Sequence, residues 1–155
     1  MAKKFKFRWL LLALLLVGIA YGVGSYTETV VVGPRSGVRK LTLAWTSDFS
    51  GDVNTTTSTK FDDGEILRVV TIPGTSSSQP TDDYDVTIED SDDADILLGA
   101  GANRDQTVTE QIVPILNNGS ATLSNFGRMF CIGPLELKVA NAGSTNTGSV
   151  IIYWR

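Results

Sequence analysis

Hydrophobic and polar residues alternate along several short stretches of the chain, with the period of two that is typical of a half-buried β-strand. The clearest example is residues 38–46, where Leu41, Leu43 and Trp45 share one face and polar side chains take the other. Residues 84–89 alternate in the same way. The same reasoning predicts further strands at residues 26–32, 53–59, 65–72, 107–116, 129–140 and 148–154.

Glycine, proline and asparagine mark where these strands stop or bend. Pro114 interrupts residues 107–116, which predicts an edge position or a bulge there. A Gly-Pro pair at residues 133–134 breaks the stretch 129–140, and the Thr-rich residues 53–59 are typical of an edge strand. We therefore expect many short strands joined by tight turns.

The stretch from Tyr84 to Gly101 predicts a β-hairpin-like unit. Its first strand is followed by an acidic turn at residues 90–95, a short strand at residues 96–98 and a glycine-rich exit.

Eight or nine short strands without a convincing helix after residue 25 indicate an all-β fold. We predict one antiparallel β-sandwich, immunoglobulin-like or jelly-roll-like, at residues 25–155. Residues 1–24 form a separate hydrophobic segment that we expect to be a helix.

This N-terminal segment combines lysines with an apolar run that starts at Trp9. Three interpretations stay open: a cleaved secretory signal, a membrane anchor contacting the bilayer through residues 9–23, or an assembly helix. For contacts with other molecules the segment offers Trp9, Leu12 and Leu16. At the other end of the chain we expect Trp154 to be exposed and to contribute to interactions.

Charge is divided unevenly along the chain. Four of the 13 basic residues lie in the first eight positions, so residues 25–155 carry 17 acidic and nine basic residues, a net charge of −8. An acidic body makes nucleic acid an unfavourable partner, because phosphate contacts require clustered Lys and Arg.

Few of the residue types that support catalysis are present. The chain has no histidine, and we expect its single cysteine, Cys131, to be buried in an apolar run. No nucleophile elbow or phosphate loop is present either. We therefore predict a protein that is not an enzyme and has no small-molecule substrate.

The densest group of carboxylates suggests a metal site. Calcium binds six to eight oxygen ligands, and Asp90, Asp92, Asp93 and Asp95 are spaced closely enough to share one ion. The spacing lacks the glycine and the distal glutamate of an EF-hand loop. The alternative is a solvated acidic turn with no cofactor.

Several segments, taken in order, resemble a group of small, mostly uncharacterised structural proteins of tailed bacteriophages. They are VRKLTLAWTS at residues 38–47, GEILRVVTIP at 64–73, YDVTI at 84–88, DILLGAGANR at 95–104, GPL at 133–135, VANAG at 139–143 and residues 148–153. The resemblance implies a β-sandwich virion component of the head, neck or tail, with no catalytic residues. The lysine-rich N-terminus is a departure from that group.

Two main functional hypotheses follow, and a third, a glycosidase-type enzyme, would need two carboxylates facing a cleft. The first is a non-enzymatic virion protein that forms a homo-oligomer and contacts other virion proteins. The second is a signal-anchored bacterial envelope domain, membrane-anchored or periplasmic, that binds carbohydrate or calcium. Aromatic residues such as Trp45, Tyr84 and Tyr153 lie in strand patterns, so we expect them to serve the core before any sugar.

Overall fold

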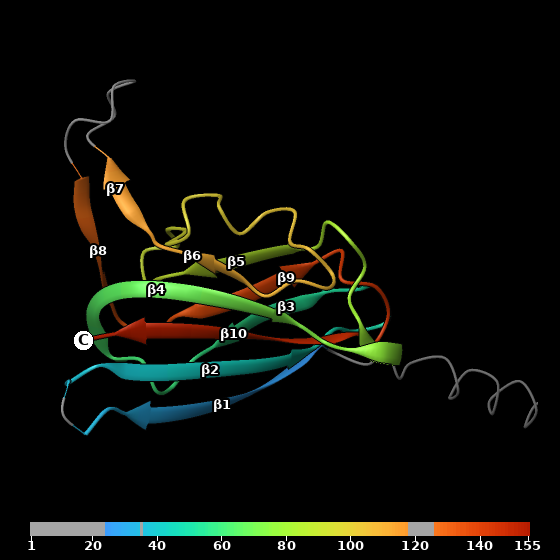
Figure 1. The fold of residues 1–155 in the computed structure, drawn as a ribbon, viewed down its shortest axis with the longest axis horizontal. Coiled ribbons are helices and arrows are strands. Elements are labelled where there is room, and N and C mark those ends of the chain that lie inside the picture. The colour runs from blue at the N-terminus through green and yellow to red at the C-terminus, as the bar shows by residue number, and fades with distance from the viewer. Residues whose placement is uncertain (1–23, 35, 118–125) are drawn as a thin grey trace, which may run out of the picture.

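A computed structural model describes residues 24–34, 36–117 and 126–155. Ten strands in this part of the chain pair antiparallel and form two stacked sheets (Figure 1). This confirms the predicted all-β, sandwich-like architecture. The finer assignment to an immunoglobulin-like or jelly-roll sandwich stays a prediction.

The large sheet has seven strands, and its C-terminal strand lies in the middle. Their spatial order is β1 (Ser25–Val32), β2 (Arg39–Thr46), β10 (Thr147–Trp154), β4 (Asp63–Pro73), β8 (Phe126–Ile132) and β7 (Ile115–Asn117), with β6 (Glu110–Ile112) also paired to β4.

The small sheet has three strands, with β9 at its centre. Their order is β3 (Val53–Thr57), β9 (Glu136–Ala140) and β5 (Asp85–Glu89). Strand β3 is therefore at an edge, as its Thr-rich sequence predicts. A short 3-10 helix, η1 (Ser76–Ser78), follows β4.

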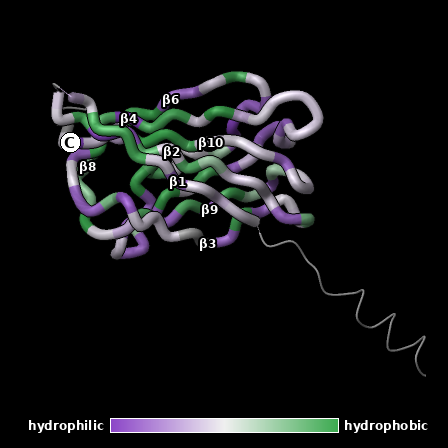
Figure 2. The backbone as a smooth tube through the Cα atoms, turned by 90° about the horizontal axis from the view of Figure 1, so that it is seen from below, coloured by the Kyte–Doolittle hydropathy of each residue, from purple (hydrophilic) through white to green (hydrophobic). Residues whose placement is uncertain are grey.

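One hydrophobic core lies between the two sheets. The apolar side chains that alternate with polar ones along the strands point into this core and fill it. Strand β10 contributes Val150, Ile152 and Trp154, while β2 contributes Leu41 and Leu43. Figure 2 shows the hydrophobic positions gathered along the central strands. Cys131 is buried in this core as expected.

Trp154 is fully buried, with 0% of its surface exposed, so our expectation of an exposed interaction residue is wrong. Its ring lies 5.3 Å from that of Phe61. Gly64 makes room for it, because a Cβ at position 64 would lie 2.8 Å from Trp154 Cδ1. Proximity to the C-terminus therefore does not imply exposure, because β10 is an interior strand.

Strand β4 changes its partner halfway along one edge. Its first residues pair with β8, and residues 69–71 pair with β6. Pro114 lies in the gap between β6 and β7, so the predicted interruption of residues 107–116 is confirmed. Beyond this gap β7 pairs only with β8, and Figure 1 shows the two strands standing away from the body; we call them the β7–β8 arm.

The predicted second strand at residues 96–98 does not form. These residues are turns that lie along the outer edge of β5, where the N–H of Ile96 donates to the carbonyl of Ile88. The N–H of Val86 donates in the same way to Gly101, a position where a Cβ would lie 1.9 Å from the Val86 oxygen. The edge of β5 is therefore closed by irregular backbone.

The hydrophobic residues Trp9, Leu12 and Leu16, and the predicted helix that contains them, lie outside the described residues. Within the part of the chain that the structure covers, no helix is long and apolar enough to cross a membrane.

Replacing Trp154 by Ala should destabilise the fold by about 3–5 kcal/mol, because it removes a fully buried indole from the core. Chemical denaturation of the full chain measures this. Phe49→Ala, at a side chain that is 59% exposed, is the control and should cost far less. Equal losses for the two variants would contradict the central placement of β10.

Candidate functional site

The four aspartates of the predicted calcium site do not converge on one point. The carboxylate of Asp90 accepts hydrogen bonds from the backbone N–H groups of Asp92, at 3.0 Å, and Ala94, at 3.2 Å. Asp95 accepts from the N–H groups of Leu97, at 2.9 Å, and Gly99, at 2.7 Å. Both carboxylates therefore stabilise turns by satisfying backbone donors.

Only Asp93 of the four lies in a group of carboxylates that could hold a metal ion. Its partners are Glu89 and Glu136, with one oxygen of each residue within 4.8 Å of the others. The ammonium of Lys138 hydrogen-bonds to Glu89, and this bond and the nearby carboxylates raise the pKa of Lys138. A protein cation therefore already neutralises part of this cluster.

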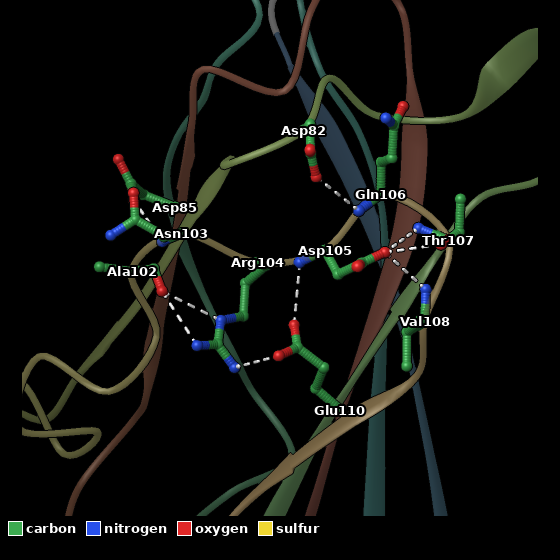
Figure 3. A network of polar contacts seen from close by, with 10 residues as sticks. All are labelled: Asp82, Asp85, Ala102, Asn103, Arg104, Asp105, Gln106, Thr107, Val108 and Glu110. Carbon is green, nitrogen blue, oxygen red and sulfur yellow. Dashed lines mark hydrogen bonds and ion pairs between the residues drawn. The ribbon is translucent and has the colours of Figure 1, made fainter.

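A second group of acidic residues fixes the loop between β5 and β6 (Figure 3). The Arg104 side chain donates to the carbonyl of Ala102 and lies 3.4 Å from Glu110. The other oxygen of Glu110 accepts the N–H of Asp105 at 2.9 Å. Asp85 accepts the N–H of Asn103 at 2.9 Å. The loop is thus tied to β5 and to β6.

Asp105 caps the next turn of the same loop. Its carboxylate accepts from the hydroxyl and the N–H of Thr107 and from the N–H of Val108. These bonds, that from the Thr107 hydroxyl first, lower the pKa of Asp105, because they favour the charged form. The carboxylates of this network therefore stabilise the loop by accepting its hydrogen bonds.

Tyr84 lies beneath this network and does not offer a reactive phenol. Burial, together with the charge of Glu110, raises its pKa to about 12. Its ring packs 5.8 Å from Trp45, in the core. With Trp45, Tyr84 and Trp154 all buried, these aromatic residues form no sugar-stacking platform. Tyr153 is half-buried and stacks against Arg68, 4.3 Å from the ring centre.

A different surface carries the strongest signal for binding. Strand pairing places Ile115 opposite Arg128, and Phe130 opposite Glu65, all on the outer face of the large sheet. Their neighbours on this face are Ile132 and Val113. We call Val113, Ile115, Phe130 and Ile132 the outer apolar patch; they are 56, 43, 60 and 66% exposed. Exposed apolar side chains gathered on one face can mark an interaction site.

Charged residues lie along one side of this patch. Glu65 accepts from Arg128 at 2.7 Å and from Arg155 at 3.1 Å. Partial desolvation raises the pKa of Glu65, but the hydrogen bonds from both arginines outweigh it and lower that pKa overall. Asp63 lies opposite Ile132 and, among the described residues, forms no ion pair.

A notch of about 330 Å³ opens beside the patch, where β4 changes partner. Its walls include Leu67, Val113, Ile115, Gly127 and Arg128. The sequence did not predict this surface, because residues 129–132 form a continuous apolar run, and such a run does not tell which side chains point outward. The register of β8 against β4 determines which side chains of β8 point outward.

Comparisons with protein-family models, with curated proteins and with solved structures found no match for this chain.

We expect calcium to leave the stability of the protein unchanged, because turn N–H groups and Lys138 already partner the acidic side chains. Thermal unfolding in EDTA, in magnesium and in calcium measures this. Lys138→Gln is the comparison variant, because it removes the Lys138 ammonium from the cluster of Glu89, Asp93 and Glu136. A calcium-specific, saturable rise in the unfolding midpoint of the wild type would restore the metal-site hypothesis.

Asp105 should contribute stability that depends on pH. Its pKa is lowered in the folded state, so the contribution is complete above the unfolded value of about 3.9 and is lost as the pH falls through the folded pKa. Asp105→Asn should therefore be less stable than wild type at pH about 7, and this difference should shrink toward pH about 2.5.

Urea denaturation at the two pH values measures the effect. Asp83→Asn is the matched control, because among the described residues the Asp83 side chain has no hydrogen bond or ion pair. A stability difference between Asp105→Asn and wild type that stays the same at both pH values would contradict the assignment.

Proposed function

We propose that this protein is a non-enzymatic structural component of a tailed-bacteriophage virion, in the head, neck or tail, and that it assembles with other virion proteins through its β-domain. The observation that carries the proposal is the outer apolar patch. It lies on the β7–β8 arm and the link before it, and it leaves Phe130 60% and Ile132 66% exposed.

Two further observations support the proposal. The sequence segments quoted above, taken in their order along the chain from residue 38 to residue 153, resemble phage structural proteins. The acidic side chains that would be the first candidates for chemistry act as acceptors for turn N–H groups, as Asp90, Asp95 and Asp105 do. Stable turns and exposed apolar edges suit a protein whose role is to pack against neighbours.

The envelope-protein alternative receives less support. Binding of carbohydrate usually requires an exposed aromatic platform, and Trp45, Tyr84 and Trp154 are buried. Binding of calcium requires free, convergent oxygens, and the cluster around Asp93 already contains Lys138. The structure thus favours a protein–protein role for the β-domain.

The proposal can be tested by complementation of a phage that lacks the gene. Phe130→Ser combined with Ile132→Ser should reduce the amount of this protein in purified particles at least tenfold, because it removes the centre of the patch. Quantitative immunoblotting of particles, normalised to the major capsid protein, measures incorporation.

Phe49→Ser is the control, because Phe49 is as exposed as Phe130 but lies in the turn between β2 and β3. It should be incorporated like wild type. If wild-type protein is absent from purified particles, the virion role is wrong; if the double variant is incorporated normally, the patch has no part in assembly.

A further inference from the structure

The geometry of the outer apolar patch points to a specific partner: a second copy of this chain, bound patch to patch about a two-fold axis with the two β8 strands antiparallel. This inference rests on the proposed function and names the contact that the patch makes.

The centre of the patch is suited to a self-complementary contact. Arg128, Phe130 and Ile132 alternate with buried residues and point outward from one strand, with Phe130 in the middle. In a two-fold contact each residue of one copy meets its symmetry-related position on the other, so a central aromatic residue packs against its own equivalent. Aromatic residues at the centre of an interface commonly dominate the binding energy.

The charges at the two ends of the patch are opposite. Arg128 lies at one end and donates to Glu65, which pairs with the central Phe130 and also accepts from Arg155. At the other end Asp63, opposite Ile132, is exposed and has no ion pair within the described residues. One end therefore carries an arginine, and the other carries a carboxylate that has no ion pair in the described part of the chain.

This order of charges selects the antiparallel arrangement. When the second copy is turned so that its β8 runs in the opposite direction, Arg128 of each copy faces the Asp63 end of the other. When the strands run in the same direction, Arg128 faces Arg128 and Asp63 faces Asp63. Like charges that face each other across an interface are unfavourable. The antiparallel contact therefore forms two favourable pairs.

The notch beside the patch adds apolar surface to the same contact. It is lined by Leu67, Val113 and Ile115 and lies next to Arg128, two residues from Phe130 along β8. In the antiparallel arrangement this notch faces the Ile132 end of the second copy, and its volume of about 330 Å³ leaves room for part of an apolar side chain. Each copy has one notch and one Ile132, so the contact is reciprocal.

The net charge of the domain also bears on the choice of partner. Residues 25–155 carry a net charge of −8, so two copies repel each other over most orientations. Beside the patch, Arg128 and Arg155 outnumber Glu65, the one carboxylate that they share. An anionic membrane would be repelled by the net charge of −8 of residues 25–155 and by Asp63 at the patch, which disfavours it as the occupant.

The test uses the full chain carrying two distinguishable tags, co-expressed so that capture of one tag reports association with the other. Arg128→Asp alone places two carboxylates together at both ends of the contact, and Asp63→Arg alone does the same with arginines. Each single variant should co-purify with itself at least tenfold less than wild type does. When the two variants are expressed together, both pairs are opposite in charge again, and association should return.

This rescue by mixing is specific to a two-fold contact between Arg128 and Asp63. Circular dichroism and the unfolding midpoint show whether each variant is folded. Association of both single variants at the wild-type level, association of the mixture no stronger than that of the singles, or a wild type that does not self-associate would each overturn the proposal.

A second pair of variants tests the apolar centre without altering charge. Phe130→Ser should weaken self-association at least tenfold, whereas Phe49→Ser, with the same exposure outside the patch, should leave it unchanged. If wild type does not self-associate but Phe130→Ser is still lost from particles, the patch binds a different virion protein: the two-fold contact is wrong and the proposed function stands. If it self-associates yet is absent from particles, the virion role fails and the two-fold contact stands.

Discussion

The pairing of β10 between β2 and β4 is the constraint on which the rest of the structure depends. Eight residues of β10 pair with β2, and seven pair with β4. This places Val150, Ile152 and Trp154 at the centre of the core and joins the first strands of the chain to the long β4. The partner change along β4 follows, because only its other edge is left for β6 and β8, and the β7–β8 arm begins where that change occurs.

Much of the secondary structure could be read from the sequence, because alternation and turn residues are local. Alternation predicts strands β2, β5 and β10, and the proline predicts the break at Pro114. The burial of Trp154 was not, since it depends on which strands lie beside β10, and pairing between distant residues leaves no local pattern. The apolar character of residues 96–98 predicts a strand. In the structure Ile96 and Leu97 are buried in the core, Leu98 is exposed, and the backbone closes the edge of β5.

The same distinction applies to the candidate sites. Carboxylate density was visible in the sequence, but the use of each carboxylate depends on the donors around it. Asp90, Asp95 and Asp105 accept from nearby backbone N–H groups, which is how short loops with several residues at positive φ satisfy their donors. The outer apolar patch combines residues from β7, from β8 and from the link between β6 and β7. Its members become neighbours only through the fold, so composition and motifs did not reveal it.

The central place of the last strand also has a consequence for synthesis on the ribosome. Strands β1 and β2 can pair early, but the inner edge of β2 stays open until residues 147–154 emerge, roughly 100 residues later. At translation rates of about 5–20 residues per second, that interval lasts about 5–20 s. During this time β2 presents an unpaired edge with Leu41, Leu43 and Trp45 uncovered. The nascent chain is then most exposed to mispairing with other chains, and a holding chaperone would have its greatest effect.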